Sequence, residues 1–427
     1  MPGPKIVIVG AGPAGLTLAR LLQVNGLPCT IYEGEKDRHA RNQGGTLDLH
    51  PKAGQRAIRE AGLWEEFSRH ARPEGECDKL VKYDGTILWD ENVLTDFQRP
   101  VDDGKPEIDR ERLRDILLES LEPNTIQWNR KIERIEANPR QQAKYTIHFA
   151  DGSKDSDIDL VVGADGGWSK VRPLIIDTAP YYSGVTGIEL WALNASEKHP
   201  WLSHFVGRGS CYMFDEGRAI MAQRNGNDSI RVYACVRQPE TWRDECGIDW
   251  SDHAAARHAL VEDYFGDCSE DLKRLVLDTS DELILRPMYM LPVGIKWETV
   301  PGATLIGDAA HLMTPFAGVG VNVAMADALV LARALISKKD GFFAKARSDQ
   351  ANIAAAIREY EKFMFDFAKE NAEETYEGLQ KHFSKDGVVE RANKFKQHYT
   401  RLTGRSLDDN AFQHQTRSIT LANAVAA

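Results

Sequence analysis

The chain has 427 residues, 42% of them hydrophobic, and its 53 basic and 64 acidic side chains give a formal net charge of −11. This length exceeds one typical domain and predicts two domains with an appendage. The negative charge, without any Lys/Arg-rich run, argues against nucleic acid or an anionic membrane as partner, so a small organic molecule is the expected ligand.

Cysteine spacing and hydrophobic runs indicate the type of protein. The six cysteines show no CxxC spacing, which favours buried free thiols over disulfides or metal ligands. No secretion signal precedes the first expected strand at Lys5, and no apolar run approaches the roughly 20 residues of a membrane span. We therefore expect a cytoplasmic monomer or weak dimer, without a membrane span and without a metal.

A dinucleotide-binding pattern opens the chain. Residues 5–9 predict a buried parallel strand, a helix is expected from Pro13 to Asn25, and a second strand ends on an acid. Glycines at the first turn would let the backbone approach a pyrophosphate resting on the helix N-terminus, and the acid can hold a ribose hydroxyl. The candidate cofactor-binding residues here are Gly10, Gly12, Ala14, Gly15 and Glu33. The pattern alone does not distinguish NAD from FAD.

A second candidate segment spans residues 304–322. It predicts the end of a buried strand, a turn that presents the Asp308 carboxylate, and a loop that delivers backbone N–H groups to a helix from Gly320 to Ile336. Asp308 can accept hydrogen bonds from a polyhydroxyl chain, and the amides can stabilise negative charge on a reduced ring. These features favour FAD, whose ribityl chain and ring need a distant partner. The candidates are Asp308, Pro315, Gly318, Val319, Gly320, Val321 and Asn322.

Three further polar residues have ambiguous patterns. Arg41 precedes a Gly-Gly loop, Asp48 lies between two leucines, and Arg110 lies in the first turn of an expected helix. An anionic or hydroxyl-rich ligand could offset the unfavourable position of Arg110 at a helix N-terminus. On pattern alone, the two arginines fit solvated surface positions equally well, and Asp48 fits a turn or cap.

Residues 174–285 read as strands and loops, with strands expected at 184–193, 211–214, 219–224 and 229–237. The last two flank a hairpin turn. Pairing symmetric about Asn227 places Gln223 opposite Arg231 and Met221 opposite Tyr233, all on one mixed face, with aliphatic side chains on the other face. The mixed face is either the wall of a pocket or a solvent-facing surface.

Several motifs together resemble one enzyme family. They are Gly10 to Gly15 with Glu33, Gly163-Ala-Asp-Gly166, and Gly307-Asp-Ala-Ala-His311 with Pro315 and residues 318–322. This set resembles the FAD-dependent aromatic hydroxylases, the class A flavoprotein monooxygenases. More narrowly, residues 44–50, 106–110, 169–172 and 307–318 are similar to the tetracycline-inactivating, TetX-type monooxygenases. The resemblance extends over about residues 5–370.

The resemblance implies an α/β fold. A Rossmann-like FAD-binding domain would comprise residues 1–76, 103–173 and 286–345, and an inserted β-sheet substrate domain would comprise 77–102 and 174–285. A long C-terminal bridging helix would span 346–384, followed by an extension over 385–427.

The resemblance also implies roles for single residues. Glu33 would bind the adenosine ribose, Asp48 and Arg110 the FAD, Asp308 the ribityl or pyrophosphate region, and Arg41 would handle NADPH. By approximate alignment, Glu189, Ser210, Met221 and Arg231 stand where the tetracycline enzymes present an amide, an arginine, a phenylalanine and a histidine. With Gln223 and Tyr233 from the hairpin, they are the candidate substrate-binding residues.

The implied activity is an NAD(P)H-consuming hydroxylation of a phenolic or polycyclic molecule, polyketide- or tetracycline-like, with O₂ and FAD as reactants through a flavin C4a-hydroperoxide. NADPH would bind transiently, and no residue is assigned as catalytic acid or base. Two alternatives remain open at this point: a flavin oxidoreductase that inserts no oxygen, and a non-enzymatic FAD-fold carrier or regulatory protein.

Overall fold

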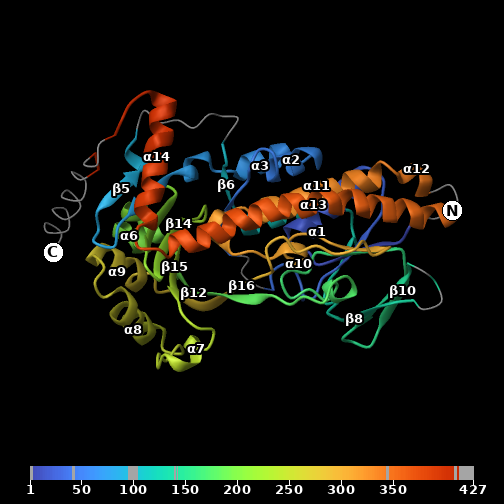
Figure 1. Cartoon of the computed structure of the whole chain (residues 1–427), viewed down its shortest axis with the longest axis horizontal. Helices are drawn as coiled ribbons and strands as arrows, with labels where there is room; N and C mark the ends of the chain where they lie inside the picture. Colours follow the sequence, from blue (N-terminus) through green and yellow to red (C-terminus); the bar gives the residue numbers. More distant parts are fainter. Residues whose placement is uncertain are drawn as a thin grey trace. The chain divides into compact units, whose positions relative to one another are not determined.

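The computed structural model describes residues 3–40, 44–94, 104–138, 141, 143–342, 346–407 and 411–412 (Figure 1). The chain divides into two compact units. Unit 1 comprises Met1–Ala71, Arg110–Tyr181 and Tyr289–Tyr376, and unit 2 comprises Arg72–Asp109, Tyr182–Met288 and Glu377–Ala427. The assignment of these units to cofactor and substrate stays a prediction.

Unit 1 is built on a parallel five-stranded sheet with the order β17-β11-β1-β2-β7. Central strands β1 and β11 are buried along their whole length and consist of Val, Ile, Leu and one Gly, which is typical of a parallel sheet covered on both faces. The strands are β1 (Ile6–Val9), β2 (Thr30–Tyr32), β7 (Ile126–Gln127), β11 (Leu160–Gly163) and β17 (Ala303–Leu305).

Helices α1 and α11 pack against each other beside this sheet, and α4 packs on α1. Their bounds are α1 (Pro13–Val24), α4 (Arg110–Glu119) and α11 (Gly320–Ile336). The remaining elements of unit 1 are β3 (Thr46–Asp48), α2 (Gly54–Glu60), α3 (Trp64–His70), an antiparallel sheet of β8 (Ile132–Ala137), β9 (Tyr145–Phe149) and β10 (Lys154–Ile158), the 3₁₀ turns η4 (Arg172–Leu174) and η5 (Pro315–Ala317), α10 (Asp308–His311) and α12 (Lys339–Phe342).

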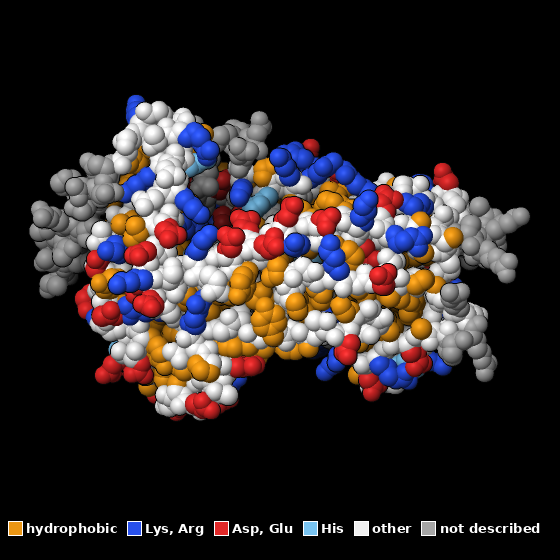
Figure 2. Space-filling view, viewed as in Figure 1, with side chains coloured by type: hydrophobic (Ala, Val, Ile, Leu, Met, Phe, Trp, Pro, Cys, Tyr) orange, Lys and Arg blue, Asp and Glu red, His pale blue; other side chains and the backbone are white. Residues whose placement is uncertain are grey.

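The expected long C-terminal helix is present as α13 (Ala346–His382). Its buried Glu361 accepts hydrogen bonds from Trp297 Nε1 at 2.9 Å, Thr299 Oγ1 at 2.6 Å and Thr304 Oγ1 at 2.9 Å. These bonds attach α13 to edge strand β17 and the loop before it. Figure 2 shows charged side chains of both signs along the helix. Lys369 pairs with Glu373 and Lys381 with Glu377 at i,i+4 spacing, so the outer side of the helix is a solvated surface.

Unit 2 is built on a seven-stranded sheet with the order β16-β12-β15-β14-β13-β4-β5. Helix α14 (Gly387–Thr403) packs on β13, β4 and β5, where Trp89 lies edge-on to Phe395 and Tyr399. The strands are β4 (Asp78–Val81), β5 (Ile87–Asp90), β12 (Tyr181–Ala192), β13 (Ser210–Asp215), β14 (Arg218–Arg224), β15 (Ile230–Arg237) and β16 (Glu282–Met290). The first part of the unit also contains the 3₁₀ turns η1 (Pro73–Glu76) and η2 (Glu91–Val93) and the short strand β6 (Glu107–Asp109).

The prediction of only strands and loops over residues 174–285 is wrong. This segment also forms α5 (Ala195–Lys198), α6 (Pro200–Val206), α7 (Trp242–Glu245), α8 (His253–Phe265) and α9 (Glu270–Leu277). In α9, Leu272, Leu275 and Val276 are buried at helical spacing and the helix contacts β14 and β15. The aromatic content of the segment concealed this periodicity.

All six cysteines are free, but only Cys211, Cys235 and Cys268 are buried, so the prediction of buried thiols holds for three of them. Burial raises the pKa of the Cys211 and Cys235 thiols to about 12. Among the described residues, no group of His, Cys, Asp and Glu is arranged to hold a metal ion. Within the same residues, every helix is too short or too polar to cross a membrane.

Candidate functional site

A tight glycine turn follows β1. Gly10 has a φ of +106°, and a Cβ atom there would lie 2.4 Å from the carbonyl oxygen of Ala164. A Cβ at Gly15 would lie 2.2 Å from the carbonyl oxygen of Gly10, whereas a Cβ at Gly12 would meet nothing within 4 Å. Gly10 and Gly15 therefore allow close backbone packing, and Gly12 keeps its outer side open to a ligand.

The first turn of α1 faces this open side. Gly12 is the N-cap and supplies no side-chain acceptor, and Pro13 occupies the first helical position. The amides of Ala14 and Gly15 follow at a positive helix end, where N–H groups without intrahelical partners favour an anion. The turn therefore fits the pyrophosphate of a dinucleotide.

Glu33 lies directly after β2 and against the glycine turn. Its Oε2 accepts a hydrogen bond from the backbone N–H of Ala11 at 2.7 Å, and its Oε1 accepts one from Glu35 N–H at 2.9 Å. Each carboxylate oxygen has a second lone pair, so the side chain can also accept from ligand hydroxyls.

Arg114 supports the same turn and was missed from the sequence. It is buried in α4, where its Nε donates to Ala11 O at 3.3 Å and its guanidinium pairs with Glu35 at 2.7 Å. The signal was a basic residue next to Leu113 on the apolar face of the helix. Only Arg110, one turn earlier, was singled out.

The second glycine-containing segment lies beside the first. Gly307 has a φ of +60°, and a Cβ there would lie 3.4 Å from the Cβ of Ala14 and 3.1 Å from the Cβ of Ala324. Asp308, the next residue, is therefore next to the N-terminus of α1. The parallel sheet thus brings both predicted cofactor segments together at the carboxyl ends of its strands, the edge where α/β proteins bind ligands.

Buried groups hold the Asp308 segment. Asp327 of α11 is fully buried; its Oδ2 accepts the backbone N–H of Gly307 at 2.8 Å and pairs with His311 Nε2 at 2.5 Å. Burial acts to lower the pKa of His311, but the charge and hydrogen bond of Asp327 outweigh it, so the pKa is raised.

Arg172 fixes the other side of this segment. It is buried, and its Nε donates to Ala309 O at 2.8 Å while its terminal nitrogen donates to Asp308 O at 3.2 Å. Asp165 supports it indirectly, because its carboxylate accepts the Ser169 hydroxyl at 2.6 Å and that hydroxyl accepts Arg172 N–H at 3.0 Å. The segment from Gly163 to Gly166 therefore has a structural role, because its Asp165 positions the arginine that holds the Asp308 segment.

The Asp308 side chain is exposed, yet the protein around it raises the pKa of its carboxyl by desolvation. The charges of His311, Arg110 and Arg172 act in the opposite direction. A carboxylate that is both reachable and surrounded by protein atoms is suited to hold the hydroxyls of a bound ligand.

The loop after α10 leads to an open helix end. The turn of η5 ends at Gly318, whose φ is +69°, and α11 begins at Gly320 with Val319 as an N-cap that makes no side-chain bond. A Cβ at Gly320 would meet nothing within 4 Å. The amides of Gly320, Val321 and Asn322 thus form a second positive helix end in unit 1.

The Asn322 side chain has a further role that sequence reasoning missed. Its Oδ1 accepts from His50 N–H at 2.7 Å and Gly54 N–H at 3.3 Å, and its Nδ2 donates to Asp48 O at 2.9 Å. The clamp fixes the loop from β3 to α2 against the start of α11. Asp48 also pairs with His50, and its Oδ1 lies 3.8 Å from a Cβ placed on Gly318.

Of the two arginines predicted to bind cofactors, Arg110 is among the described residues and Arg41 is not. Arg110 is the first residue of α4, and its backbone N–H donates to Gly45 O at 3.1 Å. Its charge acts on Asp308, so these two candidates lie in one electrostatic environment. Arg41 lies outside the described residues.

The family of this chain is shown by its similarity to known proteins. The profile of the family described as "FAD binding domain" matches residues 4–278 and 302–356. The chain belongs to this FAD-binding family. "Monooxygenase penA" of Penicillium thymicola is 32% identical over 435 residues, covering 91% of this chain and 98% of that protein.

Two further proteins extend the comparison. "3-amino-4-hydroxybenzoate 2-monooxygenase PtmB3" of Streptomyces platensis is 28% identical over 333 residues, covering 77% of this chain and 78% of that protein. The crystal structure of tetracycline destructase Tet(55) superimposes with a TM-score of 0.68 and 18% identity, covering 96% of this chain and 99% of that one. The protein is a FAD-dependent monooxygenase with the fold of these enzymes, which confirms the predicted family and fold class.

The substrate residues predicted for this monooxygenase lie on one face of the unit 2 sheet. Strands β14 and β15 pair with Met221 opposite Tyr233 and Gln223 opposite Arg231, which confirms the predicted register. Glu189 continues the first row on β12, and Ser210 continues the second on β13. Cross-strand partners share a face, so all six side chains project the same way.

This mixed face is not simply a solvent-facing surface. Glu189, Ser210 and Arg231 are buried, while Met221, Gln223 and Tyr233 are partly exposed. The opposite face carries the predicted aliphatic residues, which are fully buried: Ile230, Val232, Ala234 and Val236. Trp191 and Arg286 also contact Glu189, and neither was predicted.

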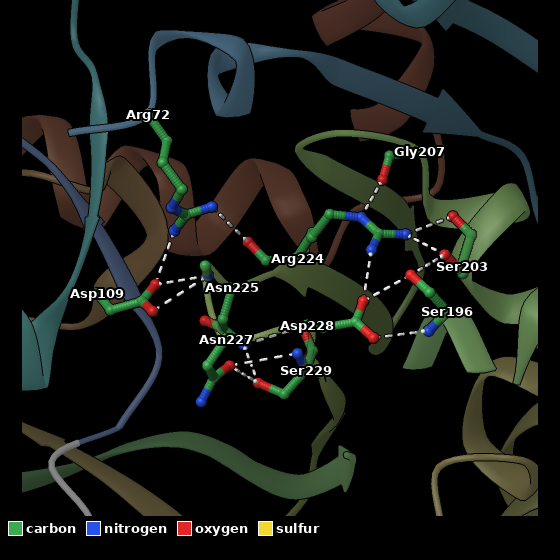
Figure 3. Close-up of polar contacts among 11 residues, drawn as sticks. Arg72, Asp109, Ser196, Ser203, Gly207, Arg224, Asn225, Asn227, Asp228 and Ser229 are labelled. Carbon is green, nitrogen blue, oxygen red and sulfur yellow. Dashed lines mark hydrogen bonds and ion pairs between the residues drawn. The ribbon is translucent and has the colours of Figure 1, made fainter. Parts of the chain in front are cut away.

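The tip of the β14–β15 hairpin is anchored by arginines (Figure 3). Arg72 pairs with Asp109 at 2.7 Å, and the same carboxylate accepts the backbone N–H of Gly226 at 2.9 Å. Arg224 donates to Gly207 O at 2.6 Å and to the backbone and hydroxyl oxygens of Ser203, both at 2.6 Å. The hairpin that carries Met221 to Tyr233 is thereby held in a defined position within unit 2.

Proposed function

We propose that this monooxygenase uses FAD, O₂ and NADPH to hydroxylate a phenolic or polycyclic small molecule. The observation that carries the proposal is the approach of Gly307 to Ala14, because it joins the two segments that a flavin dinucleotide needs at one sheet edge. Bound FAD supplies the electron transfer and the activation of O₂.

The residues of unit 1 would bind and orient the cofactor. The amides of Ala14 and Gly15 would hold the pyrophosphate, and Glu33 would accept from the adenosine ribose. Asp308 would accept from the ribityl hydroxyls or lie beside the pyrophosphate. Two observations support these roles: the space over Gly12 is open, and the carboxylates of Glu33 and Asp308 can be reached by a ligand.

The positive end of α11 would act on the reactive ring. Amides from Gly318 to Asn322, with Pro315 shaping the loop before them, would stabilise negative charge that develops on reduction. Asp48 and Arg110 would contact the cofactor from β3 and α4. NADPH would bind transiently, with Arg41 proposed to handle it.

The mixed face of the unit 2 sheet would contact the substrate. Its polar groups, from Glu189, Ser210, Gln223 and Arg231, suit hydroxyl and carbonyl substituents, while Met221 and Tyr233 suit a flat ring. A phenolic substrate class is also supported by PtmB3, whose name specifies an aminohydroxybenzoate.

Purified protein with FAD should oxidise NADPH faster when a phenolic or polycyclic substrate is added, and the product should gain one oxygen atom. The panel should include simple phenols, fused-ring phenols and tetracycline, with H₂O₂ measured to detect oxidation without hydroxylation. Stoichiometric oxygenation supports the proposal. Substrate reduction or dehydrogenation without oxygen gain would support a flavin oxidoreductase instead.

A further inference from the structure

A small pocket lies in unit 1 between α13 and the loop that follows β16. Apolar side chains from both segments form most of its wall, and α10 contributes one buried histidine. Its lining residues include Leu291, Ile295, His311, Met364, Phe365 and Ala368. They all belong to the stretch Tyr289–Tyr376 of unit 1, whereas the mixed face that carries the candidate substrate residues belongs to unit 2.

The pocket has an open and an enclosed part. Its empty space is about 290 Å³ when the part open to solvent is included, and the enclosed part has room for about one water-sized group. Lys369, which is 50% exposed, lines the open part together with Gly294. A ligand would therefore place one small group inside and leave its larger part in the open section.

His311 brings an unused ring nitrogen to this pocket. The residue is only 5% exposed, its Nε2 pairs with Asp327 at 2.5 Å, and its Nδ1 makes no hydrogen bond to any other described residue. An ionised carboxylate can only accept, so Nε2 carries a proton in this pair. Nδ1 is then an acceptor in the neutral ring and a donor in the protonated ring. A buried polar atom of this kind usually has a partner, which a ligand or a water molecule could supply.

The pocket suits a hydroxyl group attached to an aromatic ring. A hydroxyl is as small as the enclosed space requires, and it can both donate and accept, so it can bond to Nδ1 in either protonation state. A carbonyl or an ether oxygen can only accept. In the open part, the thioether of Met364 and the ring of Phe365 suit an aromatic ring, with the Lys369 side chain beside them.

We propose that this pocket binds a small phenol, whose hydroxyl bonds to His311 Nδ1 while its ring lies against Met364 and Phe365. The site does not depend on the proposed hydroxylation, and its occupant is a second ligand beside the substrate and the cofactor.

The bound phenol would also stabilise the segment that presents Asp308. His311 pairs with Asp327, and the same Asp327 oxygen accepts the backbone N–H of Gly307. A partner on Nδ1 holds the imidazole in the orientation that this pair needs. Phenol and FAD should therefore each strengthen the binding of the other, because such a coupling acts equally in both directions.

Binding is measured by ¹⁹F NMR titration of the FAD-loaded protein with three compounds of nearly the same shape: 4-fluorophenol, 4-fluoroanisole and 4-fluorotoluene. The anisole cannot donate, and its methoxy group is larger than the enclosed space, while the toluene makes no hydrogen bond. We expect 4-fluorophenol to bind about tenfold tighter than either of the others.

Variants that fill the pocket place this binding. Ala368→Leu from α13 and Ile295→Phe from the facing loop should each weaken 4-fluorophenol binding about tenfold. Because they act from opposite walls, a folding defect in one leaves the other as a test. Ala354→Leu is the matched control, since Ala354 is 9% exposed on the same helix, Ala368 is 5% exposed, and Ala354 does not line the pocket. It should bind as the wild type does.

The coupling is measured by flavin titration with and without saturating 4-fluorophenol. FAD should bind about fivefold tighter in its presence, and this gain should vanish in Ala368→Leu. Failure of 4-fluorophenol to bind, which would mean that the pocket holds water only, overturns the proposal. So does equal binding of the three compounds, binding that survives both filled variants, or an unchanged FAD affinity. Oxygen insertion is assayed on the same samples: a filled variant that still hydroxylates its substrate leaves both proposals intact, whereas phenol binding here in a protein that inserts no oxygen supports this site and refutes the proposed function.

Discussion

The Oδ2 atom of Asp327 accepts a hydrogen bond from the backbone N–H of Gly307 at 2.8 Å, so a buried carboxylate fixes the residue directly before Asp308. The same oxygen pairs with His311 at the other end of α10. One side chain of α11 thus holds both ends of the short segment that presents the proposed cofactor carboxylate.

Asp327→Asn should destabilise the fold by about 3–5 kcal/mol, because it leaves His311 without its charged partner in a buried site. FAD affinity should fall as well, since Asp308 loses its support. Chemical unfolding and flavin titration measure the two effects. The exposed Asp340→Asn is the control and should change neither; a stable Asp327→Asn protein would show that the pair does not hold the segment.

The same pair predicts a pH dependence. The folded-state pKa of His311 is raised, so its contribution to stability is complete below its unfolded pKa of about 6.5 and is lost as the pH rises through the folded value. The charge of Asp308 also acts on His311 and raises its pKa. The pKa of Tyr360 is raised as well, so this phenol stays neutral. The free energy of unfolding of the wild type should therefore decline as the pH rises from about 6.5 through the folded-state pKa of His311. In Asp327→Asn this decline should disappear.

Gly12→Ala should weaken FAD binding about tenfold or more without unfolding the protein. A Cβ at this position meets no protein atom within 4 Å and would project into the space proposed for the pyrophosphate. Flavin fluorescence titration and thermal unfolding separate the two effects. In the control Gly34→Ala, the added Cβ would lie 3.7 Å from its nearest neighbour, and FAD affinity should be unchanged. Wild-type affinity in Gly12→Ala would place the cofactor elsewhere.

Asn322→Ala should lower the free energy of unfolding by about 2–3 kcal/mol, because it leaves two backbone N–H groups and the Asp48 carbonyl without their side-chain partner. The control is Asn371→Ala, which removes one bond within α13 and should cost about 1 kcal/mol or less. Equal losses in the two variants, measured by denaturant unfolding, would contradict a clamp at Asn322.

Arg224→Met should raise the KM for the aromatic substrate and leave FAD affinity unchanged, since Arg224 holds the hairpin of unit 2 (Figure 3). A loss of about 2 kcal/mol in stability is also expected, because several backbone and hydroxyl acceptors lose a partly buried donor. The exposed Arg208→Met serves as the control. A variant with weakened FAD binding and an unchanged KM would show that the hairpin does not serve the substrate.

Local patterns predicted much of this molecule correctly. The β1–α1 turn, the start and end of α11, and the β14–β15 register all depend on residues close together in sequence, where glycine positions and alternation carry the information. The family resemblance then supplied the α/β fold class.

Longer-range relationships were not accessible in this way. The contact of Gly307 with Ala14 depends on the strand order β17-β11-β1, which no local pattern specifies. Arg114 and Arg286 look like ordinary surface arginines in sequence, because burial against Ala11 or pairing with Glu189 arises only after folding. The helices α8 and α9 were hidden by the strand-like composition around them.

The central claim is that the protein inserts oxygen from O₂ into an aromatic substrate at the expense of NADPH. The most direct measurement is product mass after turnover under ¹⁸O₂, with unlabelled water and a substrate that stimulates NADPH oxidation. One labelled oxygen atom per product molecule is the predicted result. A product that is altered but carries no label, formed while NADPH is consumed, would contradict the account and identify a flavin oxidoreductase.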